Sequence, residues 1–440
     1  MRRLLLASLA AAPLLLAPAV GAAVPSSAPT GPAGPVLPAA SMSVSTAPDP
    51  ALVAEALAEA LADPALGGSV GAVVVDVANG AVLFDQEGDV ARSTASNEKV
   101  FTAASVLQAL GPESRITTTV TWDAASSTLT IVGAGDPTLA SVAAEGSSLA
   151  DLADQVTTAV PAGTEVSLRY DTSLFSGPAL APGWEPDYPA LGVAAPVSAL
   201  LVDRARVPGT DQREDDPALA AASAFAAMVS ERGLSVDGPQ PGTSVGQVVA
   251  ETESVPIAVM VENMLTESDN DMAESLAHLA GAELTGTGSF ESGAEATANA
   301  LKVMGVDTTG LVSVDGSGLS YEDKSAPATL ASVIATFASL SVDDTTAAWS
   351  WPVIPGLPVA GLTGTLADRF LAPDSEAGAG VVRAKTGTLI GVSTLAGTAV
   401  NADGRLLVFA FMADQTTDVE LSRAALDRAA AALVSCACSS

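Results

Sequence analysis

The sequence predicts an α+β protein with two outer blocks of helices and antiparallel strands and a further β-containing block between them. Helical periodicity appears near residue 50 and dominates again from residue 256, whereas runs typical of strands lie at 69–88 and 381–415. The intervening chain shifts to a threonine-rich, β-like composition after residue 115. With 440 residues, of which 48% are hydrophobic, the chain can bury a large core in more than one domain.

Residues 1–23 have the pattern of an export signal. Two arginines follow the first methionine, an apolar run extends from Leu4 to Val20, and small residues close the segment. Residues 24–48 are rich in Pro, Ala, Ser and Gly, which predicts a disordered linker. The alternative for the first segment is an uncleaved N-terminal anchor. We expect contact with a membrane only through such an anchor. Under either interpretation the folded part works outside the cytoplasm, as a secreted protein, in the cell wall or on the outer face of the membrane.

The charge of the chain excludes several classes of partner. Fifty acidic residues against 18 basic ones give a net charge of −32, which argues against binding to nucleic acid or anionic lipid. Nothing in the sequence calls for a metal or another cofactor. The two cysteines, Cys436 and Cys438, are too close in sequence for an ordinary disulfide, so we expect hydrophobic packing to hold the fold.

Residues 49–115 are expected to form the first part of the main domain. An amphipathic helical pattern occupies 50–62, and two β runs in 69–88 flank Ala78-Asn79-Gly80, which is a hairpin signal. A second helix is predicted from Asn97 to the Gly111-Pro112 pair. Its apolar residues recur at steps of three and four: Val100, Phe101, Ala104, Leu107 and Leu110.

Residues 116–245 are expected to form a separate inserted unit. They begin with a threonine-rich hairpin and include a loop-like run at 177–189. Residues 246–440 would complete the main domain. There, helical periodicity returns at Pro256, three β runs follow in 381–415, and a closing helix is predicted near 418–433.

A serine and a lysine stand one helical turn apart at the start of the second predicted helix. Only four of the 18 basic residues are lysines, and Lys99 lies three positions after Ser96, on the same helical face. A serine hydroxyl needs a base to become a nucleophile, and the single histidine, His278, has the spacing of an ordinary helix residue. A lysine with a lowered pKa is the remaining choice. Taken alone, the pair fits a solvated helix lysine equally well.

Two further motifs remove this ambiguity. Ser268-Asp269-Asn270 lies between two helical runs, and Lys385-Thr386-Gly387 lies on a β run. Ser-x-x-Lys, Ser-Asp-Asn and Lys-Thr-Gly, in this order, are the signature of penicillin-binding proteins and class A β-lactamases. Each motif alone could arise by chance, but the ordered set of three could hardly do so.

With these motifs, the chain resembles the D-alanyl-D-alanine carboxypeptidases of the class C low-molecular-mass penicillin-binding proteins, from about residue 50 to 433. That family inserts domain material between its first two motifs, which fits the long interval from Lys99 to Ser268. The resemblance implies a β-lactamase/transpeptidase-like domain, an antiparallel sheet flanked by helices, with an inserted β-containing region. The catalytic domain would then comprise residues 49–115 and 246–440. Further similar stretches are 133–139, 192–207, 315–320 and 357–370.

The resemblance also implies roles for the first two motifs. Ser96 would attack the carbonyl between the two terminal D-alanines of a peptidoglycan stem peptide and form an acyl-enzyme, while Lys99 accepts its proton. Ser268 and Asn270 would relay protons and bind the substrate amide. The backbone N–H of Ser96 would contribute to the oxyanion hole.

The third motif would bind substrate and tune the base. Lys385 would lower the pKa of Lys99 by like-charge repulsion. Thr386 and Thr388 would bind the substrate carboxylate, and the N–H of Thr388 would complete the oxyanion hole. Gly387 suits a strand edge that a peptide must approach closely. The implied partners are therefore peptidoglycan peptides and β-lactams.

Two alternatives to a carboxypeptidase or endopeptidase stay open. A β-lactamase would share the acylation step, but residues 271–384 contain no Glu-x-x-Leu-Asn segment of the class A type. A non-catalytic cell-wall-binding protein would not need an intact nucleophile and base. The chain also departs from the family at Tyr321, where members often carry arginine. Asp315 and Ser317, a few residues earlier, are interpreted as part of a glycine-rich turn, with a role in the site as the alternative.

Overall fold

The computed structural model describes residues 46–143, 146–339 and 347–439. The predicted export signal at 1–23 lies outside these ranges, as does the predicted linker at 24–48 except for its last three residues. Of these, Pro48 forms an isolated antiparallel bridge with Ser439. No helix within the described ranges combines the length and the apolar character needed to cross a bilayer.

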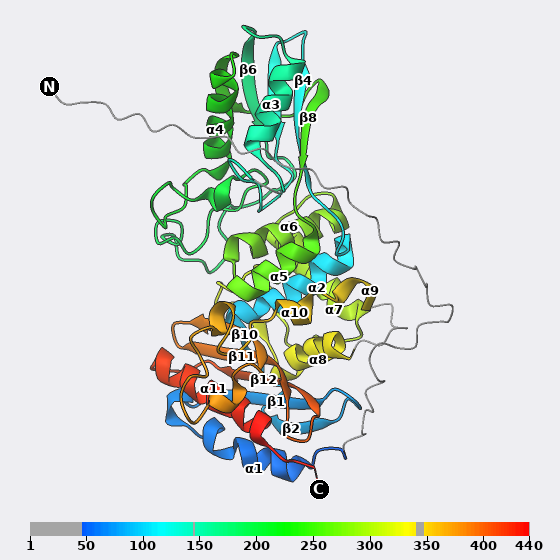
Figure 1. The fold of residues 1–440 in the computed structure, drawn as a ribbon, viewed down its shortest axis with the longest axis vertical. Coiled ribbons are helices and arrows are strands. Elements are labelled where there is room, and N and C mark those ends of the chain that lie inside the picture. The colour runs from blue at the N-terminus through cyan, green and yellow to red at the C-terminus, as the bar shows by residue number, and fades with distance from the viewer. Residues whose placement is uncertain (1–45, 144–145, 340–346, 440) are drawn as a thin grey trace, which may run out of the picture. The chain divides into compact units, whose positions relative to one another are not determined.

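One sheet forms the base of the fold (Figure 1). Its five strands lie in the order β10-β11-β12-β1-β2, and all neighbours are antiparallel. This arrangement confirms the predicted α+β class and the hairpin at Ala78-Asn79-Gly80. The strands are β1 (Val70–Asp76), β2 (Val82–Gln86), β10 (Arg383–Leu389), β11 (Val392–Val400) and β12 (Leu406–Ala413).

Helices cover both faces of this sheet. Strand β1 is buried along its whole length because its side chains alternate between two cores: Val74 packs with the outer helices and Val73 with the inner ones. The outer helices are α1 (Pro50–Leu61) and α11 (Val419–Ser435), which confirms both predicted helices. The inner layer contains α2 (Glu98–Leu110), α5 (Ile257–Glu267), α6 (Asn270–Thr285), α7 (Phe290–Val303) and α8 (Pro327–Ala338).

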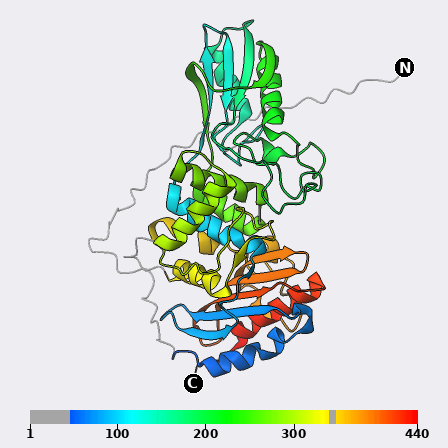
Figure 2. The same cartoon turned by 180° about the vertical axis from the view of Figure 1, so that it is seen from behind.

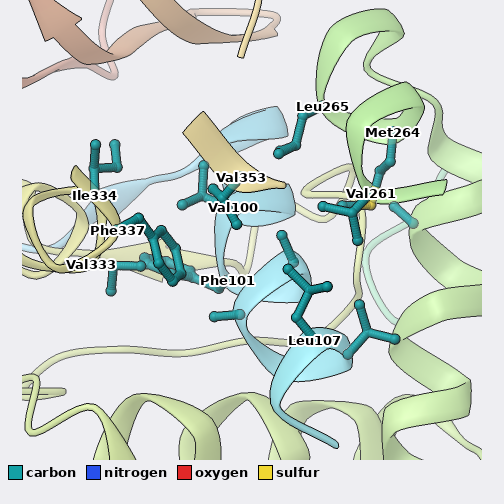
Figure 3. Packing of buried hydrophobic residues seen from close by; sticks show 14 of the residues in the cluster. Val100, Phe101, Leu107, Val261, Met264, Leu265, Val333, Ile334, Phe337 and Val353 are labelled. Carbon is teal, nitrogen blue, oxygen red and sulfur yellow. The ribbon is translucent and has the colours of Figure 1, made fainter. Parts of the chain in front are cut away.

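Helix α2 is the centre of the inner layer. Its side chains are buried from Glu98 to Leu107, and Gly111, with φ +82°, ends it by donating its N–H to the Leu107 carbonyl. Figure 3 shows Phe101 packed against Phe337 of α8. The short elements around this layer are β3 (Arg92–Ser93), β9 (Lys324–Ser325), α9 (Ala347–Ser350), α10 (Val353–Gly356) and 3-10 turns at Pro64–Leu66, Ala95–Asn97, Gly364–Leu366 and Glu376–Gly378.

A second five-stranded sheet, in the order β7-β6-β5-β4-β8, has a core of its own (Figure 2). Its strands are β4 (Thr117–Asp123), β5 (Thr128–Val132), β6 (Glu165–Asp171), β7 (Ser235–Pro241) and β8 (Gln247–Glu253), packed with α3 (Leu149–Ala159) and α4 (Pro217–Glu231). The predicted threonine-rich hairpin is β4 and β5. Strand β8 pairs with β4 although it lies beyond residue 245, so the sheet extends past the end that we expected for the inserted unit. The division into domains stays a prediction.

The expectation for the two cysteines was wrong. A disulfide joins Cys436 and Cys438, whose Cα atoms lie 5.1 Å apart. That separation is within the ordinary range for a disulfide, so the single residue between the two cysteines does not prevent the bond. The bond closes a very short loop, so the hydrophobic cores still carry the fold.

Replacing Phe101 by alanine should destabilise the inner layer by about 3–5 kcal/mol, because the fully buried ring would leave a cavity between α2 and α8. Chemical denaturation followed by circular dichroism measures the loss. Val82→Ala is the control, since Val82 is 56% exposed, and should change the free energy of unfolding by less than about 0.5 kcal/mol. Equal losses in the two variants would contradict the central position of Phe101.

Candidate active site

The three sequence motifs meet where the inner helices adjoin strand β10. Ser96 lies in the turn that precedes α2, and Lys99 lies in the first turn of that helix. Ser268 ends α5 in a left-handed conformation with φ +57°, and Asn270 begins α6. Lys385 extends from β10. Residues from three distant parts of the chain therefore face one another.

The Lys99 ammonium donates three hydrogen bonds. Its Nζ lies 3.2 Å from Ser96 Oγ, 2.8 Å from Asn270 Oδ1 and 2.7 Å from the Ser317 carbonyl oxygen. These acceptors match the three hydrogens of a charged lysine. When Lys99 loses one proton, Asn270 and Ser317 can keep the other two and leave the lone pair facing the serine. The geometry is that of a base placed against a nucleophile.

Burial sets the pKa of Lys99. Its side chain is fully buried, and the cost of holding a charge away from water lowers the pKa to about 8. Four carboxyl groups oppose this change and favour the charged form. They belong to Asp315, Glu274, Asp269 and Glu98. A lysine with this pKa is neutral in an appreciable fraction of molecules near neutral pH.

We expected the charge of Lys385 to lower the pKa of Lys99, but burial is the leading cause there. Burial first, and repulsion from the charge of Lys99 second, hold the pKa of Lys385 well below its usual value. Its Nζ lies 2.9 Å from Ser268 Oγ and 2.9 Å from its neighbouring Thr386 carbonyl.

The site contains buried acids that the motifs did not reveal. Burial raises the pKa of Glu98 and that of Glu274 to about 8, and that of Asp323 well above its usual value. Ser313 Oγ donates to Glu98 at 2.6 Å, and the Gly316 N–H donates to Glu274 at 3.1 Å. Glu98 and Glu274 lie inside helical runs, whereas Asp323 lies in the loop before β9, and no motif in the sequence marks any of the three.

The glycine-rich turn at 315–320 is part of the site. The Asp315 carboxylate accepts backbone N–H groups from Ser317 at 3.0 Å and Gly318 at 2.6 Å, which fixes the turn and presents the Ser317 carbonyl to Lys99. Gly318 has φ +78°, and a Cβ on it would lie 1.9 Å from the carbonyl oxygen of Ala95. This contact supports the residue before Ser96, which itself has the unusual φ of +43°.

Thr386 of the third motif and the nearby Thr388 line a cavity of about 720 Å³ together with Ser96 and Ser268. Thr386 Oγ1 donates to Thr365 Oγ1 at 2.8 Å, and Thr388 accepts from Arg423 of α11 at 3.3 Å. Arg423 was missed from the sequence, where nothing connects α11 with the motifs. Gly387 lies on the edge strand β10, and a Cβ there would meet Thr394 Oγ1 at 2.2 Å, so packing against β11 also requires glycine.

His278 stands apart from this chemistry, as predicted. Its ring is buried in α6, its Nδ1 lies 2.9 Å from the Glu274 carbonyl, and it contacts the rings of Phe175 and Phe290. Burial lowers its pKa to about 4. A neutral packing role fits these contacts.

Comparisons with known proteins agree with the geometry. The model of the D-Ala-D-Ala carboxypeptidase 3 (S13) family matches residues 53–216 and 210–433. Carboxypeptidase DacB of Mycolicibacterium smegmatis is 37% identical over 398 residues, which cover 88% of this chain and 84% of that protein. D-alanyl-D-alanine carboxypeptidase of an Actinomadura species is 29% identical over 434 residues, 79% of this chain and 78% of that protein.

Solved structures share the fold. The crystal structure of penicillin-binding protein 4 from Haemophilus influenzae superposes with a TM-score of 0.70 at 22% identity, and the match covers 86% of this chain and 97% of that one. A second structure of that protein, complexed with a β-lactam, matches with a TM-score of 0.64 at 21% identity over the same shares of the two chains. The α+β fold of a β-lactamase/transpeptidase-like domain with an added region is therefore shown.

Gly318→Ala should slow acylation by penicillin at least tenfold, because the new methyl group would displace the Ala95 carbonyl and with it the turn that holds Ser96. Gly80→Ala is the matched control: it has φ +71°, and a Cβ there meets nothing within 4 Å. The rate of labelling with a fluorescent penicillin measures the effect. A Gly318→Ala protein that reacts at the rate of Gly80→Ala would show that this contact is dispensable.

Proposed function

The chain belongs to the D-Ala-D-Ala carboxypeptidase 3 (S13) family of serine peptidases, and we propose that Ser96 is its nucleophile and Lys99 its general base. The single observation that carries this assignment is the contact between the two side chains, 3.2 Å from Nζ to Oγ, at a fully buried lysine whose pKa is lowered to about 8. An arginine could not serve here, because its pKa is too high to supply a neutral base.

In the proposed reaction, neutral Lys99 takes the proton of the Ser96 hydroxyl as Oγ attacks the carbonyl of the penultimate D-alanine. The C–N bond to the terminal D-alanine then breaks and leaves an ester on Ser96. The Ser268 hydroxyl, which accepts a hydrogen bond from Lys385, passes its proton to the departing amine, and the proton that Lys99 took from Ser96 replaces it, so that Lys99 is neutral again. Water attacks the ester, releases the shortened peptide and restores the serine.

The remaining residues bind the substrate in this proposal. Thr386 and Thr388 hold the terminal carboxylate, and the Arg423 guanidinium beside Thr388 adds positive charge at that end of the cavity. Asn270 contacts the substrate amide, and Gly387 lets the peptide lie along the edge of β10. The backbone N–H groups of Ser96 and Thr388 form the oxyanion hole.

We further propose that peptidoglycan stem peptides are the substrates and that β-lactams bind covalently. Peptidoglycan lies outside the cytoplasm, so the enzyme acts there. Residues 1–23 serve its export in this proposal, and residues 24–48 link that segment to the folded part. The sequence pattern of two arginines and an apolar run supports the export role.

A β-lactam should form a stable one-to-one adduct on Ser96, visible by intact mass and located by peptide mapping. The strained amide is placed where Ser96 attacks, and the tethered leaving group obstructs the water that would hydrolyse the ester. Ser96→Ala should abolish the adduct, and Lys99→Ala should slow it by several orders of magnitude, because an unactivated hydroxyl remains. Release of free D-alanine from a peptide ending in D-Ala-D-Ala is the matching assay for turnover.

Ser93, which is buried close by in β3, is the internal control and should stay unlabelled. Label on a residue other than Ser96 would refute the proposed nucleophile. Rapid turnover of penicillin would favour the β-lactamase alternative. Neither label nor released D-alanine would favour a non-catalytic wall-binding protein.

The rate of acylation should rise with pH to an apparent pKa near 8, because Lys99 must be neutral to accept a proton and burial lowers its pKa to about 8. Lys385→Ala should lower the rate, because Ser268 loses a hydrogen-bond partner, and should leave the midpoint near 8, because burial is the leading cause of the lowered pKa of Lys99. Stopped-flow labelling between pH 6 and pH 10 tests both statements. A midpoint that moves upward in Lys385→Ala would restore Lys385 as the perturbing charge.

A further inference from the structure

Three consecutive residues of the inserted region adopt a left-handed backbone. Asp203, Arg204 and Ala205 have φ values of +52°, +56° and +52°, although none of them is glycine. Such a conformation persists only where surrounding contacts hold it, and it occurs most often at functional sites. Here the Asp203 N–H donates to the Leu139 carbonyl at 2.9 Å, and Ala205 is buried.

The turn directs one side chain at the second motif. Arg204 Nη1 lies 2.5 Å from Oδ2 of Asp269, the residue between Ser268 and Asn270. The other oxygen of Asp269 accepts the Met272 N–H at 2.9 Å and so caps α6. The Asp269 side chain is 8% exposed, so its charge has little access to water. Arg204 is the cation that forms a direct ion pair with it.

The two residues after Asp269 are held by the same segment of the inserted region. Asn270 Nδ2 donates to the Val193 carbonyl at 2.9 Å. Arg213 donates to the buried carboxylate of Asp271 through Nε at 2.9 Å and through Nη2 at 2.8 Å. Residues 193–213 therefore contact each of the positions 269–271. Ser268, in its left-handed conformation, lies between these positions and the end of α5.

We propose that Arg204 is a positioning residue for the peptidase reaction. It fixes and neutralises the carboxylate of Asp269 and thereby holds Ser268 and Asn270 against the two lysines. The proposal rests on the proposed roles of Ser268 and Asn270. It makes the inserted region a part of the catalytic machinery, although that region contains none of the three motifs. The left-handed turn is the device that brings the guanidinium into place.

The charge of Arg204 also reaches the base through Asp269. The groups that face Lys99 are Glu98 from α2, Asp269 and Glu274 from α6 and its cap, Asp315 from the glycine-rich turn, and Lys385 from β10. The carboxylate of Asp269 raises the pKa of Lys99, and Arg204 offsets that carboxylate. Loss of the arginine should therefore raise the pKa of Lys99, whereas loss of the aspartate charge should lower it.

The test compares Arg204→Gln with Asp269→Asn in the full chain, using the second-order rate of acylation by a fluorescent penicillin as a function of pH. Arg204→Gln should react more slowly, on the order of tenfold to a hundredfold, with its midpoint at higher pH. Asp269→Asn should have its midpoint at lower pH while the helix cap survives, because Asn caps as well as Asp. In the double variant the midpoint should return toward that of the unsubstituted protein.

Two further variants separate positioning from a loss of folding. Arg204→Lys keeps the charge but not the planar guanidinium, so it should keep the midpoint and recover only part of the rate. Arg206→Gln is the matched control next to this turn, since the guanidinium of Arg206 pairs with the exposed Asp211, at 3.9 Å, and the variant should behave like the unsubstituted protein. Melting temperatures of all variants identify any that unfold.

An unchanged rate and midpoint in folded Arg204→Gln would overturn the proposal, as would midpoints that move in the same direction in Arg204→Gln and Asp269→Asn. If Arg204→Gln does not fold, a midpoint in Asp269→Asn that fails to move downward overturns it. Absence of any label on Ser96 in the unsubstituted protein would instead refute the proposed function, so the two failures are distinguishable.

Discussion

Desolvation of the Lys99 ammonium is the constraint on which the rest of the site depends. In water a lysine keeps its proton until about pH 10 and cannot act as a base near neutral pH. Complete burial lowers the pKa of Lys99 to about 8, even though four carboxyl groups around it favour the charged form. Two of these, Glu98 and Glu274, are themselves so buried that their pKa rises to about 8. Burial thus weakens the opposing acids as well as the charged lysine.

The fold creates this burial by enclosing α2. Its small residues, such as Ala103 and Ala104, let α5, α6 and α8 approach closely, and its start is fixed to the sheet. Asn97 Nδ2 donates to Thr394 Oγ1 of β11 at 2.6 Å, and Thr394 Oγ1 lies 3.2 Å from the Thr94 carbonyl. The residues on both sides of Ser96 are therefore tied to the strand beside the one that carries Lys385. One sheet edge and one helix end define the relative positions of Ser96 and both lysines.

Local patterns were enough to predict the α+β class, the hairpin of β1 and β2, both outer helices and the three motifs. Contacts made only by tertiary structure were not accessible. The pairing of β8 with β4 joins strands more than a hundred residues apart, and nothing local marks it. Arg204 and Glu274 look like ordinary surface charges in the sequence, because their burial and partners depend on segments far along the chain. The leading cause of the lowered pKa of Lys99 was not predicted for the same reason: charge is visible in a sequence, whereas desolvation is not.

The division of labour between lysine and arginine follows from the same chemistry. Four lysines stand beside fourteen arginines, and two of those lysines are the fully buried residues of the site. The ten ion pairs found among the described residues all use arginine, including that of Arg204 with Asp269 of the second motif and that of Arg213 with the nearby Asp271. Guanidinium stays charged when it is buried, so it can fix a carboxylate permanently, whereas an ammonium can be made to release its proton. At the site, arginine therefore acts as the permanent charge and lysine as the titratable one.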